Sequence, residues 1–136
     1  MTPAAEVLLI EDEEIDRQIV QELLALRGRG RVRVTEATGF HAGLDLLRTR
    51  AFDLILLDTR LREISALSAL RAVGEEAPDT PILPHTPFIT VQLRQAARVR
   101  GPFDVAVRGD LNPMWTAVSN LLSLDAAAPR RSAPAA

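Results

Sequence analysis

The residues best suited to chemistry stand at four places along the chain, each at the end of an apolar run. Glu11 and Asp12 follow the first run, Asp58 the second, Thr86 the third and Arg108 the fourth. Carboxylates gathered at one place repel each other, and a divalent cation that takes oxygen ligands, such as Mg²⁺, offsets that repulsion. One carboxylate can then act as the nucleophile toward a phosphoryl group, whose other oxygens a hydroxyl and a guanidinium would hold. Together these residue types predict phosphoryl transfer to a carboxylate, provided that the fold brings them to one place.

The apolar runs predict the strands of a buried sheet. Residues 6–10 and 52–57 have the composition of strands covered on both faces, while residues 31–37 alternate polar and apolar as an edge strand does. Shorter runs predict two more strands over residues 81–85 and 103–107. Apolar residues at helical spacing predict a helix after each strand, one from Ile15 to a stop at Gly28 and others over residues 40–50, 64–73, 91–99 and 114–124.

Five repeats of strand followed by helix predict an α/β fold. Its core would be a five-stranded parallel sheet, doubly wound by helices on both faces through right-handed crossovers. In open sheets of this kind, ligands bind beyond the carboxyl ends of the strands. The carboxylates, the Thr86 hydroxyl and the Arg108 guanidinium all follow strand ends, so the fold predicts that they meet at one edge of the sheet.

Length and charge bound the class of protein. The chain has 136 residues, enough for one domain over residues 1–124, and residues 125–136 carry no large apolar side chain, which predicts a disordered tail. The net charge of −2 gives no field that would draw the protein to nucleic acid or to an anionic membrane. No apolar run reaches the length of a membrane span and the first residues lack the basic flank of a signal peptide, so we expect a cytoplasmic protein.

Three residue types are absent from the chain, namely cysteine, tyrosine and lysine, and all 16 basic residues are arginine. Without cysteine there are no disulfides, thiolate metal sites or thiol nucleophiles. Without lysine there is neither Schiff-base chemistry nor a Walker A phosphate loop. A coding bias toward arginine explains the missing lysines, yet any cation that faces a phosphoryl group must then be an arginine.

Helix capping offers a simpler explanation for part of the acidic cluster. Acidic residues just before a helix are favoured by capping and by the helix macrodipole, and we assign Glu13 and Glu14 to that role. A single Asp after a strand is more often a turn residue than a nucleophile. The functional interpretation therefore rests on Glu11, Asp12 and Asp58 occurring together at the strand ends that one fold prescribes.

The segments VLLIEDE, FDLILLD, PILPHT and VAVR resemble the receiver domain of two-component response regulators, over nearly the whole chain from about Glu6 to Leu124. The flavodoxin-like (βα)5 strand order 2-1-3-4-5 that we assign is also the order of that family. The resemblance implies that Asp58 accepts a phosphoryl group and that Thr86 is the switch hydroxyl, with Arg108 in place of the family's phosphate-facing lysine. It also implies a Mg²⁺ site made by Glu11, Asp12, Asp58 and the backbone carbonyl of Arg60.

Two loops depart from the pattern of that family. The family has a Pro four residues after the acceptor and then an Asp-Gly turn, where this chain has Arg62 and Ser65-Ala66. Ala66 lacks the freedom of glycine for a positive φ, so we expect the loop to take another path. A Lys-Pro pair joined by a cis bond is replaced by Arg108-Gly109, which we expect to be trans. Arginine is a planar fork rather than a compact point charge, so its exchange for lysine is not conservative.

Four further residues receive structural interpretations. Pro84 lies in a strand that should be central and it removes a ladder donor, so we expect a bulge or a local break there. His85 is interpreted as a partly buried core residue, with a functional role as the less favoured alternative. His41 is expected on the surface of the second helix, and Trp115 in the core or as an anchor for a partner.

The favoured function is a single-domain response regulator receiver in phosphorelay signal transduction, which is not an enzyme. A histidine kinase or phosphotransfer protein would phosphorylate Asp58 with Mg²⁺. The charge change would move Thr86 and shift the face formed by the fourth helix, the fifth strand and the fifth helix. No output domain follows residue 125, so we expect output through an unknown downstream protein or through a homodimer.

Two alternatives remain beside that function. In a phosphorylation-independent pseudo-receiver, a guanidinium from Arg60 or Arg108 would pair with Asp58 in place of a metal and the domain would act as a protein-interaction module. A phosphatase of the haloacid dehalogenase type is disfavoured, because that family needs an Asp where Arg60 stands and a catalytic lysine.

Overall fold

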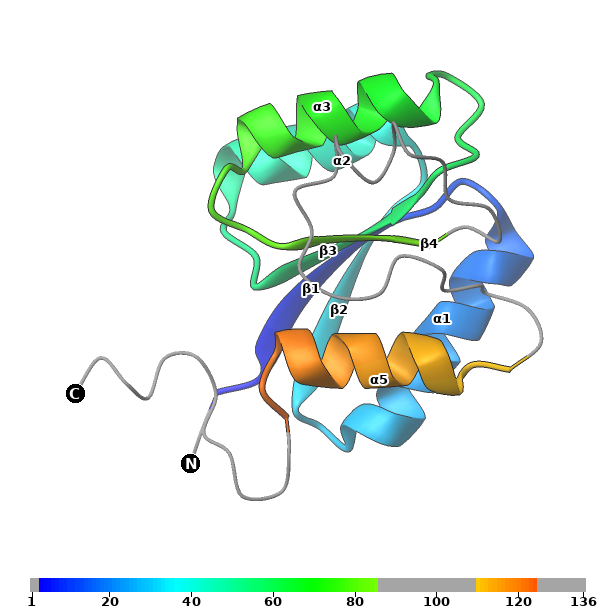
Figure 1. The fold of residues 1–136 in the computed structure, drawn as a ribbon, viewed down its shortest axis with the longest axis vertical. Helices are drawn as coiled ribbons and strands as arrows, with labels where there is room; N and C mark the ends of the chain where they lie inside the picture. The colour runs from blue at the N-terminus through cyan, green and yellow to red at the C-terminus, as the bar shows by residue number, and fades with distance from the viewer. Residues whose placement is uncertain (1–2, 86–109, 125–136) are drawn as a thin grey trace.

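A parallel sheet with helices on both faces organises the computed structural model, which describes residues 3–85 and 110–124 (Figure 1). Its strands are β1 (Ala5–Ile10), β2 (Val32–Ala37), β3 (Leu54–Asp58) and β4 (Ile82–His85), in the spatial order β2-β1-β3-β4. The helices are α1 (Glu14–Gly28), α2 (Phe40–Thr49), α3 (Ala66–Glu76) and α5 (Asn112–Leu121). All three strand pairs are parallel. The α/β class and the order of the first four strands are therefore confirmed, while the elements expected over residues 91–99 and 103–107 lie outside the described residues.

Alternation along the strands divides the hydrophobic core into two halves. Successive side chains of a strand point to opposite faces of the sheet. Val7 and Leu9 of β1 belong to the half that packs with α1 and α5, whereas Leu8 and Ile10 belong to the half that packs with α2 and α3 (Figure 1). All four side chains are fully buried, and burial of each contributes roughly 2 kcal/mol. Burial on both faces explains why this segment is a continuous apolar run.

The first helix buries a narrower stripe than its apolar spacing predicts. Val20, Leu23 and Leu24 of α1 lie in the core, but Ile15 and Leu26 are 55% and 77% exposed. At 3.6 residues per turn, Leu26 and Ile15 lie roughly 110–130° around the helix from the centre of the buried stripe. These two apolar side chains of α1 therefore lie outside the core.

Pro84 causes no bulge in β4. The pairing of β3 with β4 continues without interruption through Pro84 to His85. The carbonyl of Pro81 accepts a hydrogen bond from the amide of Ile55 at 3.0 Å, and in a parallel pair alternate residues bond to the same neighbour. The odd-numbered residues of β4 therefore face β3, and the missing N–H of Pro84 belongs to the opposite side of the strand. The expected bulge or break is corrected for this reason.

Three smaller expectations are confirmed. In the described part of the sheet β2 pairs with β1 alone and is half-buried, as an edge strand should be. His41 is exposed on α2, and Trp115 on α5 packs half-buried against the core half under α1. The division into a domain over residues 1–124 and a tail stays a prediction, because residues 125–136 lie outside the described part.

Among the residues that the structure describes, no helix combines the length and the apolar character needed to cross a membrane.

Candidate functional site

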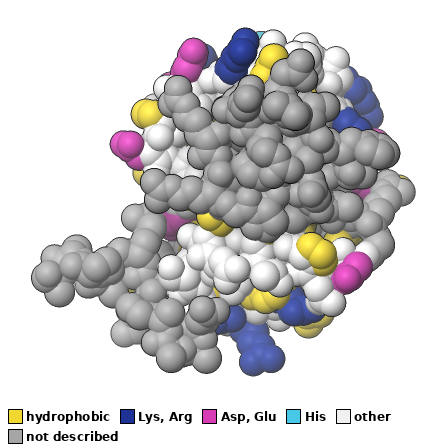
Figure 2. Space-filling model, viewed as in Figure 1, with side chains coloured by type: hydrophobic (Ala, Val, Ile, Leu, Met, Phe, Trp, Pro, Cys, Tyr) yellow, Lys and Arg dark blue, Asp and Glu magenta, His cyan; other side chains and the backbone are white. Residues whose placement is uncertain are grey.

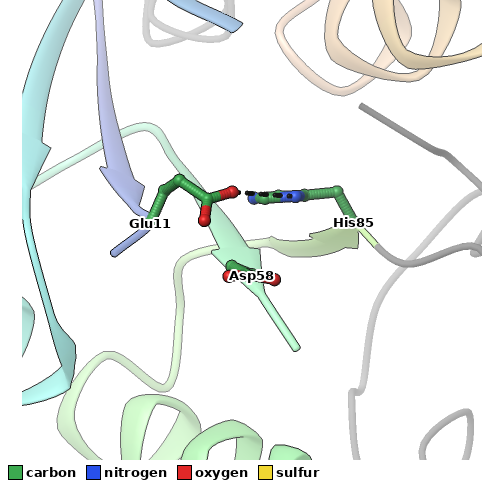
Figure 3. A group of neighbouring side chains, drawn as sticks. All are labelled: Glu11, Asp58 and His85. Carbon is green, nitrogen blue, oxygen red and sulfur yellow. Dashed lines mark ion pairs between the residues drawn. The ribbon is translucent and has the colours of Figure 1, made fainter. Parts of the chain in front are cut away.

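Glu11, Asp58 and His85 lie together at the carboxyl edge of the sheet (Figure 3). Asp58 and His85 are the last residues of β3 and β4 and are paired in register, and Glu11 directly follows β1. Alternation places Asp58 on the same face as Leu56, and Glu11 on the same face as Leu9, in the half that packs with α1 and α5. One ligand atom from each of the three residues lies within 4.8 Å of the others. The structure therefore brings together two of the predicted site carboxylates and adds a histidine.

Glu11 has a buried carboxyl group, and only one of its two oxygens accepts a hydrogen bond from the described residues. The residue is 1% exposed, its Oε2 accepts a hydrogen bond from the backbone N–H of Glu13 at 3.1 Å, and its Oε1 has no donor among the described residues. Burial first, and then the neighbouring Asp58, raise the pKa of Glu11 from 4.5 to about 9. At neutral pH Glu11 therefore carries a proton that it can share with Asp58.

His85 is almost wholly buried and is held in its neutral form. It is 2% exposed, and its Nε2 has no hydrogen-bond partner among the described residues. Burial lowers the pKa of His85 to about 4, although the negative charge of Asp58 opposes this shift. Its Nδ1 lies 3.8 Å from Oε1 of Glu11, which is too long for a hydrogen bond. At neutral pH the contact drawn as a dashed line in Figure 3 therefore joins two uncharged groups. The expectation of a partly buried core histidine is corrected, because His85 is almost fully buried and lies beside Glu11 and Asp58.

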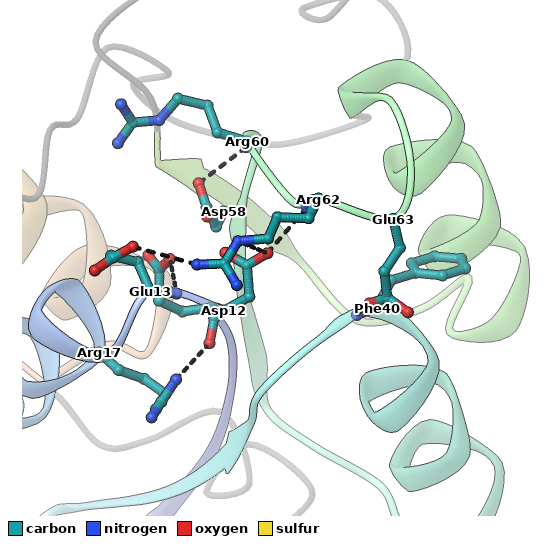
Figure 4. A network of polar contacts seen from close by, with 9 residues as sticks. Asp12, Glu13, Arg17, Phe40, Asp58, Arg60, Arg62 and Glu63 are labelled. Atoms are coloured by element: carbon teal, nitrogen blue, oxygen red, sulfur yellow. Dashed lines mark hydrogen bonds and ion pairs between the residues drawn. The ribbon is translucent and has the colours of Figure 1, made fainter.

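The carboxylate of Asp58 is held by the backbone of the loop that follows it (Figure 4). Asp58 is 3% exposed, and its Oδ1 accepts a hydrogen bond from the backbone N–H of Arg60 at 3.0 Å. The guanidinium of Arg60 instead lies 3.7 Å from Oδ2 of Asp16, a buried carboxylate in the first turn of α1. The alternative in which Arg60 pairs with Asp58 is therefore wrong, because the carboxylate partner of Arg60 is Asp16, whereas Arg108, the other arginine of that alternative, lies outside the described residues.

Asp12 is engaged by Arg62 rather than by the buried cluster (Figure 4). Its Oδ2 accepts a hydrogen bond from the backbone N–H of Arg62 at 2.9 Å and lies 3.9 Å from the Nε of the same residue. The Nη2 of Arg62 also lies 3.6 Å from Oε2 of Glu13. Asp12 follows Glu11 by one residue, so the alternation of an extended chain turns it to the other side of the sheet. Of the carboxylates predicted to bind a metal, Glu11 and Asp58 thus lie together, whereas Asp12 does not join them.

The loop between β3 and α3 needs no left-handed residue. The hydroxyl of Ser65 caps α3, and Ala66 is the first residue of that helix with an ordinary backbone conformation. A side-chain oxygen of Glu63 accepts a hydrogen bond from the backbone N–H of Phe40 at 2.8 Å, which fastens the loop to the start of α2 (Figure 4). Ala66 therefore stands at the family's glycine position without strain, because here that position is the start of a helix and not a turn that needs a positive φ.

Some of the predicted site residues are not placed by the structure. Thr86, Arg108 and Gly109 lie outside the described residues, so their predicted roles stay predictions. The metal-binding role of the Arg60 carbonyl stays a prediction as well. Conversely, Asp16 could not be found from the sequence, because an acid in the first turn of a helix is typical of a favourable interaction with the helix dipole and nothing in its spacing sets it apart.

The sequence matches a known protein family. A model described as the response regulator receiver domain matches residues 7–107. The transcriptional regulatory protein DltR of Streptococcus agalactiae is 35% identical over 95 residues, which are 70% of this chain and 39% of DltR. The sensor histidine kinase AruS of Pseudomonas aeruginosa is 36% identical over 112 residues, 79% of this chain and 10% of AruS. The chain thus spans less than half the length of these curated relatives.

Comparison of the structure with solved structures gives one fold. The chemotaxis protein CheY4 of Vibrio cholerae has a TM-score of 0.72 at 21% identity, covering 88% of this chain and 99% of CheY4. The response regulator TrrA of Thermotoga maritima, in complex with Mg²⁺ and BeF, has a TM-score of 0.72 at 20% identity, covering 87% and 99%. A complex of the histidine kinase ThkA with TrrA matches at a TM-score of 0.72 and 21% identity, covering 87% and 98%. The flavodoxin-like fold is confirmed by these neighbours.

Proposed function

The chain belongs to the response regulator receiver domain family, and from that premise we propose that it acts in phosphorelay signal transduction by accepting a phosphoryl group on Asp58. The observation that carries this proposal is the buried cluster at the edge of the sheet, where Asp58 ends β3 beside the second carboxyl group of Glu11. The chain spans only part of its curated relatives, so the outputs of those proteins are not assigned to it. Its own role in the proposal is that of a signalling module and not of an enzyme.

The hydrogen bond from Arg60 selects which oxygen of Asp58 reacts. The backbone N–H of Arg60 donates to Oδ1, so we assign the attack on phosphorus to Oδ2. With a phosphohistidine as donor, the new O–P bond forms as the N–P bond breaks, and the ring nitrogen keeps the bonding electron pair. The acyl phosphate then carries two new negative oxygens into a buried pocket, a change that can shift neighbouring elements.

The residues present fit a hard divalent cation. The undonated Oε1 of Glu11 and the carboxylate of Asp58 are oxygen ligands of the kind that Mg²⁺ prefers, whereas the nitrogen of His85 is not. We propose that Glu11 and Asp58 hold Mg²⁺, and that Asp12 joins them when Arg62 releases it. When bound, the cation would offset the negative charge of the phosphoryl oxygens.

Replacement of Arg62 by alanine is expected to strengthen Mg²⁺ binding. The guanidinium of Arg62 is exposed and competes for the Asp12 carboxylate, so its loss should raise the Mg²⁺ affinity about threefold, as expected for one exposed ion pair. Isothermal titration with MgCl₂ at low ionic strength measures the change. Arg71→Ala removes an exposed arginine from α3 and is the matched control, and an affinity that is equal in both variants would show that Arg62 does not restrain Asp12.

The donor and the output surface complete the proposal. We propose a histidine kinase or a phosphotransfer protein as donor, since a sensor histidine kinase and a complex of a kinase with its regulator are among the proteins that the chain resembles. Thr86 would follow the phosphoryl group and Arg108 would face it. The signal would leave through the fourth helix, the fifth strand and α5, either to a downstream protein or to a second copy of the chain, in the cytoplasm.

A phosphorylation-independent module of the same fold is the second candidate. One observation favours it: Arg62 already supplies Asp12 with a counter-charge from within the protein. Such a module would keep one conformation and neither need nor bind Mg²⁺ tightly. The two candidates therefore differ in a property that the isolated chain can show.

The test is the intact mass of the wild-type chain after incubation with acetyl phosphate and Mg²⁺. A small donor is the appropriate choice, because Asp58 is only 3% exposed. Gain of the mass of one phosphoryl group, reversed by hydroxylamine, is the expected result. If a competent receiver treated in parallel is phosphorylated and this chain is not, the first proposal is overturned and the second is retained.

A further inference from the structure

A hollow of about 540 Å³ lies between the end of α1 and α5, at the edge of the sheet opposite to Asp58. The backbone N–H of Ala5, the first residue of β1, donates to the carbonyl of Arg31 at 2.8 Å, which places the hollow where the parallel strands begin. The side chains that line it include Leu26, Arg27, Arg29, Arg31, Trp115 and Leu124. None of these residues belongs to the site described above.

The three arginines of the hollow carry charge that no described carboxylate offsets. The guanidinium of Arg31 donates to the backbone carbonyls of Gly28 at 2.9 Å and Leu124 at 2.7 Å, and that of Arg27 donates to the amide oxygen of Asn112. All of these acceptors are neutral, and in the described part of the chain no ion pair involves Arg27, Arg29 or Arg31. Most of the other described arginines do have a carboxylate within 4.0 Å, namely Arg17, Arg33, Arg48, Arg50, Arg60 and Arg62. Among the described residues, the positive charge of the hollow is therefore oriented by hydrogen bonds to neutral acceptors and has no carboxylate as counter-charge.

Apolar side chains adjoin this charge. Leu26 is 77% exposed, and the half-buried Trp115 faces the same hollow from α5. Figure 2 shows basic and apolar side chains side by side at the end of the molecule where α1 ends. A leucine left in water beside arginines gains by being covered, because burial of its side chain is favourable.

Arg29 places its positive charge at a backbone position that glycine would fit with less strain. Arg29 is the C-terminal cap of α1 and has a φ of 51°, in the left-handed region. Glycine is the usual residue at that position, because a side chain is strained there. An arginine at this cap keeps a positive charge at the rim of the hollow at some cost in stability.

We propose that the surface formed by Leu26, Arg27, Arg29, Arg31 and Trp115 docks an acidic segment of a partner protein, independently of phosphorylation at the far edge of the sheet. Carboxylates of the partner would meet the three guanidinium groups, and an apolar side chain of the partner would cover Leu26 and Trp115. An exposed leucine and a half-buried tryptophan beside the charges favour a polypeptide over a nucleic acid. Residues 125–136 of the chain itself match poorly, since they hold two arginines and one aspartate.

Trp115 makes binding at this surface directly observable. It is the only tryptophan of the chain and there is no tyrosine, so the intrinsic fluorescence reports on this place alone. The probe is a short synthetic peptide of repeated Glu-Glu-Leu units without aromatic residues, and its counterpart carries Gln for Glu. We expect the acidic peptide to change the Trp115 emission saturably, with an affinity that falls as salt is added, and the Gln counterpart to leave it unchanged.

Arg29→Gly separates the docking role from folding. Glycine relieves the left-handed strain, so the variant should unfold a few degrees higher than the wild type, while its affinity for the acidic peptide should be about fivefold lower. Leu26→Ser should also weaken binding, and Arg71→Ala on α3 should not. Asp58→Asn should bind as the wild type does, so failure of the phosphorylation proposal would leave this result unchanged.

Four results would overturn the proposal. They are an emission that the acidic peptide does not change, equal binding by wild type and Arg29→Gly, tighter binding of duplex DNA than of the peptide, and self-association in sedimentation velocity that Arg29→Gly abolishes. The third would assign the surface to nucleic acid, and the fourth to a second copy of the chain.

Discussion

The Asp58→Asn variant is expected to gain no phosphoryl group under conditions in which the wild-type chain gains one. Asparagine has the size of aspartate, and its amide oxygen can still accept the hydrogen bond that the backbone N–H of Arg60 donates to Oδ1 at 3.0 Å. The amide nitrogen that replaces Oδ2 is not a nucleophile, so the group that attacks phosphorus is lost while the pocket keeps its shape. Intact-mass spectrometry after treatment with acetyl phosphate and Mg²⁺ measures this loss directly.

Asp79→Asn is the matched control for that experiment. Asp79 is an exposed aspartate in the turn before β4, and its replacement changes the net charge by the same amount as Asp58→Asn. The control should be phosphorylated as the wild type is. Phosphorylation of Asp58→Asn at the wild-type level would place the acceptor elsewhere, and Asp12→Asn would then be the next variant to measure.

The agreement between sequence and structure at Asp58 and Glu11 has a local cause. Each residue ends or follows an apolar run, and the strand period of two decides the face on which it lies. The end of an apolar run and the alternation of side chains along a strand can both be found from the local sequence, without knowing how the rest of the chain folds. The same period explains why Asp12, one residue further, is not part of the cluster.

The features that sequence analysis missed depend on contacts between distant segments. Arg62 reaches Asp12 across 50 residues, and the guanidinium of Arg60 reaches Asp16 on α1 instead of the neighbouring Asp58. The missing N–H of Pro84 has no effect on the pairing with β3, because only the odd-numbered residues of β4 form hydrogen bonds to β3. None of these facts is encoded in spacing, since each depends on the path of a loop or on the phase of one strand against another.

The stability of the protein is expected to fall as the pH rises above roughly 6.5, and Glu11 is the cause. The pKa of Glu11 is about 9 in the folded chain against a usual 4.5, so between these values folding takes up a proton and the free energy of unfolding decreases with pH. His85 acts in the opposite direction. Its pKa is about 4 in the folded chain against a usual 6.5, so it costs stability as the pH falls through that window. The two slopes oppose each other between 4.5 and 6.5, and above 6.5 the slope of Glu11 remains alone.

The Glu11→Gln variant should therefore be more stable than the wild type at alkaline pH, by on the order of 5 kcal/mol at pH 8. Glutamine keeps the size of the side chain and an oxygen for the backbone N–H of Glu13, and it does not ionise. Urea unfolding, followed by circular dichroism at several pH values without Mg²⁺, gives the free energy of unfolding of each chain. Glu22→Gln removes an exposed carboxylate from α1 and is the control, and it should retain the wild-type slope above pH 6.5. If Glu11→Gln keeps that slope as well, Glu11 is ionised in the folded chain and the shared proton assigned to it is wrong. If the slope disappears, the same variant should also fail to bind Mg²⁺, because the oxygen that a proton occupies at neutral pH is the one assigned to the cation.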